Sequence, residues 1–228
     1  KAETLYRQIL KSSPQEFDAL SLLGAVLCQK KELHKGLEYL RTALKLRPQS
    51  LNLLLNTGLC LQELDRNTEA LEIFEKGDKL STNSSVFLRG RATALLRLSR
   101  FSEALECYVS IEGKKANTAA DDINHGLVLY ELGKYEGSLA RLAKARRADA
   151  ADSTLLYNMG RCLLKLGKLE EALNLFDSAL KISPDDSKTL IARAETARAM
   201  NDSASALLSI EHALTLDSKN SFARGFKA

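Results

Sequence analysis

Apolar residues recur at steps of three and four along almost the whole chain, a spacing that places them on one face of an α-helix. The clearest stretch runs from Ser153 to Asp186. It predicts two short helices separated by a turn at Gly167-Lys168 and stopped at Pro184, because proline cannot continue a helix. Neither helix could bury its apolar face alone, so we expect copies of this unit on both sides.

The same pattern returns every 34 residues. One slot of the unit always holds a tiny residue: Gly24, Gly58, Ala92, Gly126, Gly160 and Ala194. A second slot always holds leucine: Leu37, Leu71, Leu105, Leu139, Leu173 and Leu207. A third holds a large apolar residue: Leu40, Phe74, Tyr108, Leu142, Phe176 and Ile210. A small residue permits close helix approach and a bulky one fills the gap beside it. The pattern therefore predicts an all-α chain of stacked helix pairs.

The unit resembles the tetratricopeptide repeat, which has the same period and an L-G-x-x-Y…A-x-x-x-F…P pattern. The best copy matches it through Leu156, Met159-Gly160, Leu163, Ala172, Phe176, Ala179 and Pro184. This resemblance implies a right-handed α-solenoid that covers 1–228 as a single domain. The predicted parts are a partial repeat at 1–16, full repeats at 17–50, 51–84, 85–118, 119–152, 153–186 and 187–220, and the start of a further helix at 221–228. Since the pattern begins and ends inside a repeat, we expect a fragment of a longer protein.

The pattern weakens between the third and fourth repeats. Gly113 and the polar residues after it predict a helix that ends early and a looser turn from about 112 to 118. The next helix is expected to start near Ala119, capped by Asn117 or Thr118. Asp122 and His125 stand where other repeats have apolar residues, so 112–125 is the predicted soft point of the array. After the second repeat, the polar run 81–85 is expected to end one helix and cap the next.

The amino-acid composition limits which class of partner and which cellular compartment we expect for this protein. The balance of 33 basic and 29 acidic residues is too mild to predict a nucleic-acid partner. No apolar run approaches the roughly 18 residues that insertion across a membrane requires. The four cysteines, at 28, 60, 107 and 162, form no C-x-x-C pair. We interpret them as buried packing residues in a reducing compartment, which predicts a cytoplasmic protein.

The sequence lacks the motifs that carry chemistry. It has no G-x-S-x-G, Walker, Gly-rich dinucleotide or H-E-x-x-H motif. The three histidines occupy different slots of the unit, and none has a second His or Cys at metal-ligand spacing. We therefore predict no catalytic residues, no metal site and no cofactor, and do not expect this chain to be an enzyme.

The resemblance also implies where a partner binds. In tetratricopeptide proteins the first helix of each repeat lines a concave surface that holds segments of other proteins. The candidate peptide-binding residues at those positions are Asn56, Arg89, Arg97, Asn124, Tyr130, Tyr157, Asn158, Arg161, Lys165, Lys188 and Arg198.

Asn56, Asn124 and Asn158 share one slot of the unit. They are similar to the asparagine ladder in the repeat arrays of O-linked N-acetylglucosamine transferases. An asparagine side chain donates and accepts at once, so it can pair with a peptide backbone. The alternative is that asparagine is a consensus residue at this slot.

The basic excess lies mostly in the last two repeats. Arginine favours bidentate contact with carboxylates, which predicts a partner segment with acidic residues. The alternative is a solvated face with intramolecular i, i+4 pairs. The Lys/Asn/Arg constellation of chaperone-binding tetratricopeptide domains is not reproduced in three consecutive repeats, so we do not expect an Hsp90-type or Hsp70-type tail as the ligand.

Three hypotheses of function remain open. The leading one is a protein–protein interaction scaffold that binds a peptide or protein segment along its concave face. In the second, the chain is the substrate-recruiting arm of a larger enzyme, since Ala2–Leu10 resembles the arrays that open bacterial glycosyltransferases and sulfotransferases. In the third, it is a self-assembling scaffold that docks through its convex face or an open end.

Overall fold

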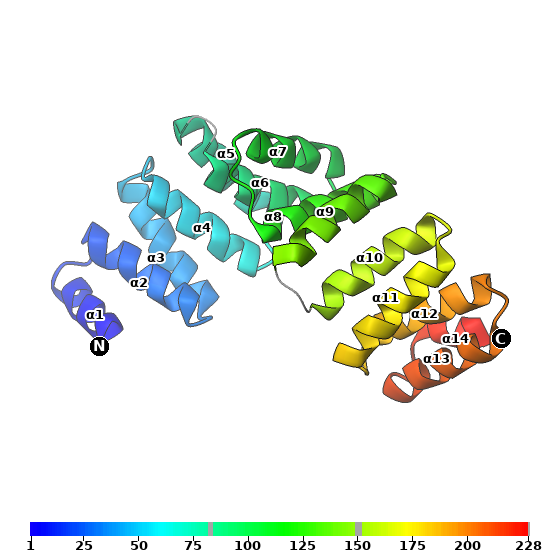
Figure 1. Ribbon diagram of the computed structural model, residues 1–228. Coiled ribbons are helices and arrows are strands. Elements are labelled where there is room, and N and C mark those ends of the chain that lie inside the picture. Colours follow the sequence, from blue (N-terminus) through cyan, green and yellow to red (C-terminus); the bar gives the residue numbers. More distant parts are fainter. Residues whose placement is uncertain (82–83, 149–151, 228) are drawn as a thin grey trace. The chain divides into compact units, whose positions relative to one another are not determined.

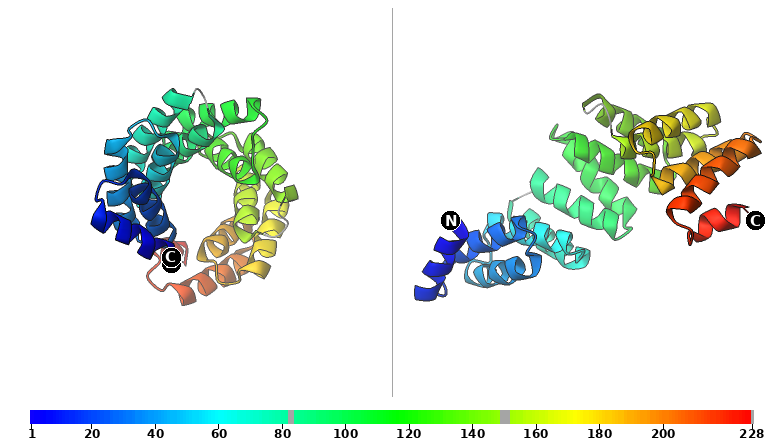
Figure 2. Two further views of the ribbon diagram at one scale, coloured as in Figure 1. Left: turned by 90° about the vertical axis from the view of Figure 1, so that its left-hand side faces the viewer. Right: turned by 90° about the horizontal axis from the view of Figure 1, so that it is seen from below.

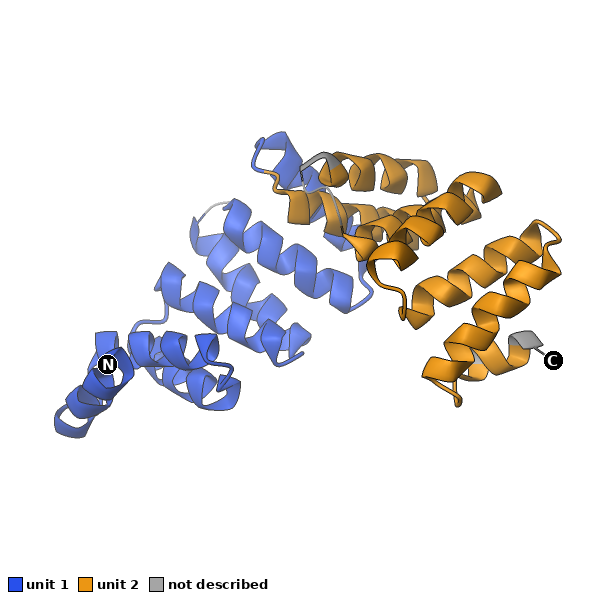
Figure 3. Cartoon of the chain, turned by 60° about the horizontal axis from the view of Figure 1, so that its bottom comes forward, with its two compact units in different colours: residues 1–116 blue, residues 117–228 orange. Residues whose placement is uncertain are grey.

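The computed structural model describes residues 1–81, 84–148 and 152–227 (Figure 1). Over these residues the chain forms fourteen α-helices and no strand. The predicted all-α solenoid class is therefore confirmed. The chain divides into two compact units, residues 1–116 and residues 117–228 (Figure 3).

The helices of the first unit form three pairs after a lone α1 (Ala2–Ser12). The pairs are α2 (Phe17–Gln29) with α3 (Leu33–Leu46), α4 (Leu51–Glu63) with α5 (Asn67–Ser81), and α6 (Ser85–Arg97) with α7 (Phe101–Gly113). Within a pair the two helices pack on each other, and α3 and α5 also pack on the first helix of the next pair.

The second unit repeats this arrangement. Its pairs are α8 (Ala119–Glu131) with α9 (Tyr135–Ala148), α10 (Ser153–Lys165) with α11 (Leu169–Ile182), and α12 (Ser187–Ala199) with α13 (Ser203–Leu216), followed by α14 (Ser221–Lys227). Successive pairs of each unit stack side by side in both views of Figure 2. That the two units form one unbroken solenoid stays a prediction.

The small and large slots of the repeat meet inside each pair. A Cβ added to Gly58 would lie 2.5 Å from Cε1 of Phe74, and one added to Gly160 would lie 2.6 Å from Cε1 of Phe176. Both rings are fully buried. The tiny residue therefore makes room for the bulky side chain of the second helix, as the sequence predicts.

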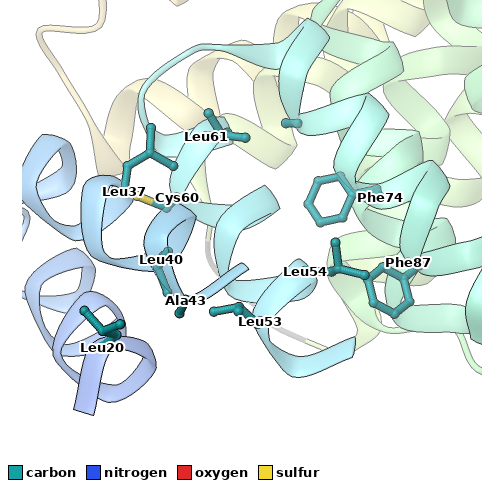
Figure 4. Packing of buried hydrophobic residues seen from close by; sticks show 11 residues of the cluster. Leu20, Leu37, Leu40, Ala43, Leu53, Leu54, Cys60, Leu61, Phe74 and Phe87 are labelled. Atoms are coloured by element: carbon teal, nitrogen blue, oxygen red, sulfur yellow. The ribbon is translucent and has the colours of Figure 1, made fainter. Parts of the chain in front are cut away.

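A second small–large contact joins consecutive pairs in the first unit. Figure 4 shows Leu54 beside Phe74 and Phe87 in one buried cluster. A Cβ added to Gly77, on α5, would overlap the Phe87 ring, on α6. Four of the other full repeats carry alanine where Gly77 stands, as at Ala43, and the third repeat carries Ile111. The large Phe87 ring and the missing methyl group of Gly77 therefore compensate for each other.

Helix ends follow the prolines where these are present. Pro14, Pro48 and Pro184 each stand two residues after the last helical residue of α1, α3 and α11. In the polar run 81–85, α5 ends at Ser81 and Ser84 is the N-cap of α6, but the Ser84 side chain makes no cap hydrogen bond. The predicted side-chain cap is thus not formed at Ser84, and positions 82 and 83 lie outside the described residues.

The turn inside each pair has one residue with a left-handed backbone. These residues fall at the same slot of the repeat, with φ between 57° and 73°: Lys31, Asp65, Ser99, Gly133, Gly167 and Asn201. Only two of them are glycine, the residue that adopts this conformation without steric cost. The geometry of the turn therefore requires the left-handed backbone conformation at this slot, and side chains other than glycine are tolerated there.

The predicted irregular turn between the third and fourth repeats is present. α7 ends at Gly113, and α8 begins at Ala119 with Thr118 as its N-cap. Asp121 N donates to Thr118 Oγ1 at 3.2 Å, and Thr118 N donates to Asp121 Oδ2 at 2.9 Å, so the two residues form a capping box. The boundary between the two units, at residues 116 and 117, falls in this turn.

The two polar residues predicted at core positions of the fourth repeat are both buried. Asp122 forms ion pairs with Lys144 Nζ at 3.0 Å and Arg141 Nη1 at 3.4 Å, both on α9. His125 is 3% exposed. That 112–125 is the softest part of the chain stays a prediction.

Candidate peptide-binding face

The first helices of successive pairs lie against one another inside each unit. In the first unit α4 contacts both α2 and α6, and in the second unit α10 contacts both α8 and α12. In a stack of helix pairs, the helices that contact their counterparts in the neighbouring pairs line the inner side of the stack. We call the side of each unit that its first helices form the inner face.

Three of the predicted binding residues gather on the inner face of the second unit. The Arg161 guanidinium carbon lies 4.1 Å from the centre of the Tyr130 ring and 5.6 Å from that of Tyr157. A guanidinium over an aromatic face is attracted by the ring quadrupole. All three side chains are half-buried. The arginine is therefore held in a fixed position while part of its surface faces solvent.

The two tyrosines are themselves supported from the second helices. The Tyr130 ring meets Tyr135, on α9, edge to face with ring centres 5.3 Å apart, and the Tyr157 ring lies 6.2 Å from that of Phe176, on α11. Burial raises the pKa of the Tyr157 phenol above its usual value. Its hydroxyl is therefore protonated at neutral pH and can donate a hydrogen bond.

The asparagines beside this cluster keep their hydrogen-bonding capacity. Asn124 lies on α8 and Asn158 on α10, one turn before Arg161, and Asn158 is only 8% exposed. Within the described part of the chain, no residue forms a hydrogen bond with the side-chain amide of Asn56, Asn124 or Asn158. Polar groups with so little solvent access normally find a partner. The two amides of the second unit are thus suited to pair with a bound backbone.

Charged side chains of both signs lie near the cluster or on the same first helices, including the carboxylates of Asp186 and Glu195, which help to raise the pKa of Tyr157. Lys165, Lys188 and Arg198 are exposed on α10 and α12. Of the described carboxylates, none forms an ion pair with Arg161, Lys165 or Lys188. The intramolecular pairs that the alternative interpretation requires are therefore not formed by these three residues, and their charge is available to an anionic ligand.

The predicted arginines of the first unit contact the backbone instead. Arg89 Nη2 donates to the Ala116 carbonyl at 3.1 Å, and Arg97 Nη1 donates to the Gln62 carbonyl at 2.7 Å. Gln62, on α4, donates in turn through Nε2 to the Gly90 carbonyl at 3.0 Å. These bonds link successive helices. Periodicity shows which face a side chain occupies but not which carbonyl it reaches, so the sequence could not predict these contacts.

The first helices of the first unit also carry exposed apolar side chains. Leu22, Leu59 and Val86 lie on the first helices α2, α4 and α6, and they are 47%, 46% and 43% exposed. Asn56 is half-buried beside them on α4. The structure therefore separates the predicted residues into a compact group in the second unit and scattered positions in the first.

Other features of the surface lie away from these residues. A hollow of about 470 Å³ between α9 and α11 is lined by residues such as Arg146, Asn174 and Leu175, and contains no predicted site residue. The described residues include no group of three or more His, Cys, Asp or Glu side chains arranged to hold a metal ion. In the same ranges, every helix is too short or too polar to cross a membrane.

The cysteines are largely buried, as expected for packing residues. Cys60, Cys107 and Cys162 are buried and Cys28 is half-buried. One relationship was not predicted: Cys28 Sγ lies 2.8 Å from Cys60 Sγ. The two residues are 32 positions apart and occupy different slots of successive first helices, so their spacing matches no short motif.

Comparison with protein families finds two partial matches. Residues 123–187 match the family model of the tetratricopeptide repeat. Residues 1–77 match the model of subunit 3 of the anaphase-promoting complex, or cyclosome. No curated protein sequence matches the chain.

Solved structures with a similar fold share little sequence with this chain. YrrB, a TPR protein with an unusual peptide-binding site, is 18% identical with a TM-score of 0.69, over 82% of this chain and 97% of its own. PilW, a type IV pilus biogenesis factor, is 16% identical with a TM-score of 0.81, over 94% and 99%. The Cut9–Hcn1 hetero-tetramer of APC/C is 17% identical with a TM-score of 0.68, over 97% of this chain and 44% of its own. This similarity shows the tetratricopeptide fold.

Proposed function

We propose that this tetratricopeptide chain is a protein-interaction scaffold whose second unit binds an extended, acidic segment of another protein. The observation that carries the proposal is the position of Arg161. Its guanidinium is held against Tyr130 and near Tyr157, and no carboxylate of the described chain neutralises it. A fixed guanidinium fork is suited to bidentate contact with a carboxylate.

The surrounding residues supply the other contacts that such a segment needs. Asn124 and Asn158 can accept from and donate to the backbone of a bound strand without reading its sequence. Lys165 and Lys188 offer two further cations on the exposed rim. Peptide binding by YrrB and the assembly of Cut9 with Hcn1 support an interaction role, as properties of those proteins.

The test uses two matched pools of synthetic peptides. One pool carries Glu and Asp at alternating positions, and in the other Gln and Asn replace them. We expect the chain to bind the acidic pool, and the double variant Asn158→Ala/Arg161→Ala to bind it at least tenfold more weakly, since about 1.4 kcal/mol corresponds to a factor of ten. Increasing salt should weaken binding because exposed charge pairs are screened.

The matched control is Asn174→Ala/Arg146→Ala. It removes the same residue types from the hollow between α9 and α11, on the second helices. This variant should bind like the unmodified chain, and circular dichroism should show that both variants fold. Equal binding of the two pools would refute an acidic ligand, and equal loss in both variants would refute the inner face as the site.

Two other roles are proposals of a different class. As the arm of a larger glycosyltransferase or sulfotransferase, the chain would be continuous with a catalytic domain, which the gene sequence on either side would reveal. Self-association is favoured by Leu208 and Leu207 on α13, which are 67% and 44% exposed. Light scattering that reports a monomer at all concentrations would exclude self-association.

A cytoplasmic location is likewise proposed, because the described cysteines are free thiols and free thiols are typical of reducing compartments.

A further inference from the structure

The sulfur atoms of Cys28 and Cys60, in the first unit, are in contact, and the neighbouring backbone leaves room for both. Cys28, near the end of α2, donates through Sγ to Cys60 Sγ, on α4, at 2.8 Å. The Cys60 thiol also contacts the Leu33 carbonyl of α3 at 3.4 Å. A Cβ added to Gly36, on α3, would lie 2.5 Å from Cys28 Sγ. A side chain at position 36 would thus displace the sulfur, and glycine leaves it room.

This pair differs in reactivity from the other two cysteines. Cys60 is 3% exposed and Cys28 is half-buried, so a small solute can reach the pair from one side. The hydrogen bond between them lowers the pKa of the Cys60 thiol, and the same bond together with burial raises the pKa of the Cys28 thiol. Burial raises the pKa of the Cys107 and Cys162 thiols, and Cys162 Sγ donates to Ser138 Oγ at 3.2 Å. The thiolate is the reactive form, so Cys60 is the thiol that reacts first, and Cys28 lies in contact with it.

We propose that Cys28 and Cys60 are a peroxide-responsive dithiol that forms a reversible disulfide between α2 and α4. In the first step, one thiol reacts with hydrogen peroxide; the O–O bond breaks, and a sulfenic acid and one water are produced. In the second step, the other sulfur attacks the sulfenic sulfur, the S–S bond forms, and a second water leaves. Two thiols are oxidised and one peroxide is reduced. A dithiol reductant restores both thiols by exchange.

The disulfide would join the first helices of two successive pairs. Cys60 lies one turn after Asn56 on α4, so the bond would fix the inner face of the first unit next to that residue. Cross-links between distant positions stabilise mainly by restricting the unfolded chain. Oxidation should therefore raise the thermal unfolding temperature, and a reductant should reverse the increase. This proposal is independent of peptide binding by the second unit.

The test counts free thiols in the full chain before and after treatment with hydrogen peroxide, by alkylation in denaturant and mass spectrometry. The reduced chain has four. We expect two to be lost, a disulfide peptide that joins the segments around Cys28 and Cys60, and recovery of all four with dithiothreitol. The matched control variant, Cys107→Ser, should still lose two free thiols on treatment with peroxide.

The variant Cys28→Ser should form no intramolecular disulfide under the same treatment, because a sulfenic acid at Cys60 then has no neighbouring thiol to react with. Peptide mapping of the unmodified chain keeps the proposal testable even if this variant is poorly folded. Retention of all four thiols in the unmodified chain, or a disulfide that joins two copies of the chain, would overturn it.

Discussion

The guanidinium carbon of Arg161, on α10, lies 4.1 Å from the centre of the Tyr130 ring, on α8. This contact joins the first helices of two successive pairs and orients a cation on the inner face of the second unit. Cation–π contacts contribute about 0.5–2 kcal/mol, depending on how far the pair is desolvated. The binding residue is therefore ordered before a partner arrives, which reduces the entropy lost on binding.

Replacing the aromatic face should weaken binding without removing any charge. We predict that Tyr130→Leu reduces affinity for the acidic peptide pool by roughly fivefold, since about 1 kcal/mol of orientation is lost. Fluorescence anisotropy with a labelled pool measures this. Tyr130→Phe keeps the ring and should bind almost normally. If the phenylalanine variant is as weak as the leucine variant, the hydroxyl and not the ring face is responsible.

The contact between Gly77 and Phe87 predicts a compensating pair of substitutions. Gly77→Ala should lower the free energy of unfolding by about 1–3 kcal/mol because its methyl group overlaps the Phe87 ring. Phe87→Leu alone should lower it by about 1 kcal/mol or more through the space it leaves. The double variant reproduces the combination Ala43 with Leu53 of the preceding repeat, and should recover most of the loss. Urea unfolding measures all three, and strictly additive losses would contradict direct contact.

The left-handed slot of the turns predicts a stabilising substitution. Ser99 has φ of 59°, a conformation that costs a residue with a Cβ about 1 kcal/mol relative to glycine. We expect Ser99→Gly to raise the free energy of unfolding by up to that amount. Ser102→Gly, three residues later and inside α7, should lower it by about 0.5–1 kcal/mol. The prediction fails if both glycines change stability in the same direction.

The capping box at the start of α8 predicts a local loss of stability. Thr118→Val removes the hydroxyl that accepts from Asp121 N, and should cost about 1 kcal/mol. Amide hydrogen exchange should then accelerate first in the opening turn of α8. Thr154→Val, at an exposed site in the first turn of α10, is the control and should leave α8 unchanged. Uniform acceleration over the whole second unit would show that the cap does not act locally.

The periodicity of the sequence accounts for much of the fold because tertiary contacts repeat with it. The Gly58–Phe74 and Gly160–Phe176 contacts connect two slots at a constant offset, so one copy is enough to predict the others. The left-handed slot was not predicted, because Lys31, Ser99 and Gly167 share a backbone conformation but no side-chain property. The register of the repeat could have indicated it.

The candidate site was predicted less completely than the fold. The slots place Tyr130, Tyr157 and Arg161 on first helices, and the structure brings them together. The carbonyl contacts of Arg89 and Arg97 depend on where a long side chain ends, which periodicity does not encode. The Cys28–Cys60 contact depends likewise on how far α2 and α4 are offset.

We propose that an acidic segment lies along the first helices of the second unit, and this placement can be measured directly. The most direct measurement places a photoreactive phenylalanine analogue at position 165 or at position 174, and irradiates each chain with the tightest-binding peptide of the acidic pool. Lys165 is exposed on α10, and Asn174 is exposed on α11. We predict a cross-linked product from position 165 and none from position 174. Capture at position 174, or equal capture at both, would show that the segment does not lie along the first helices.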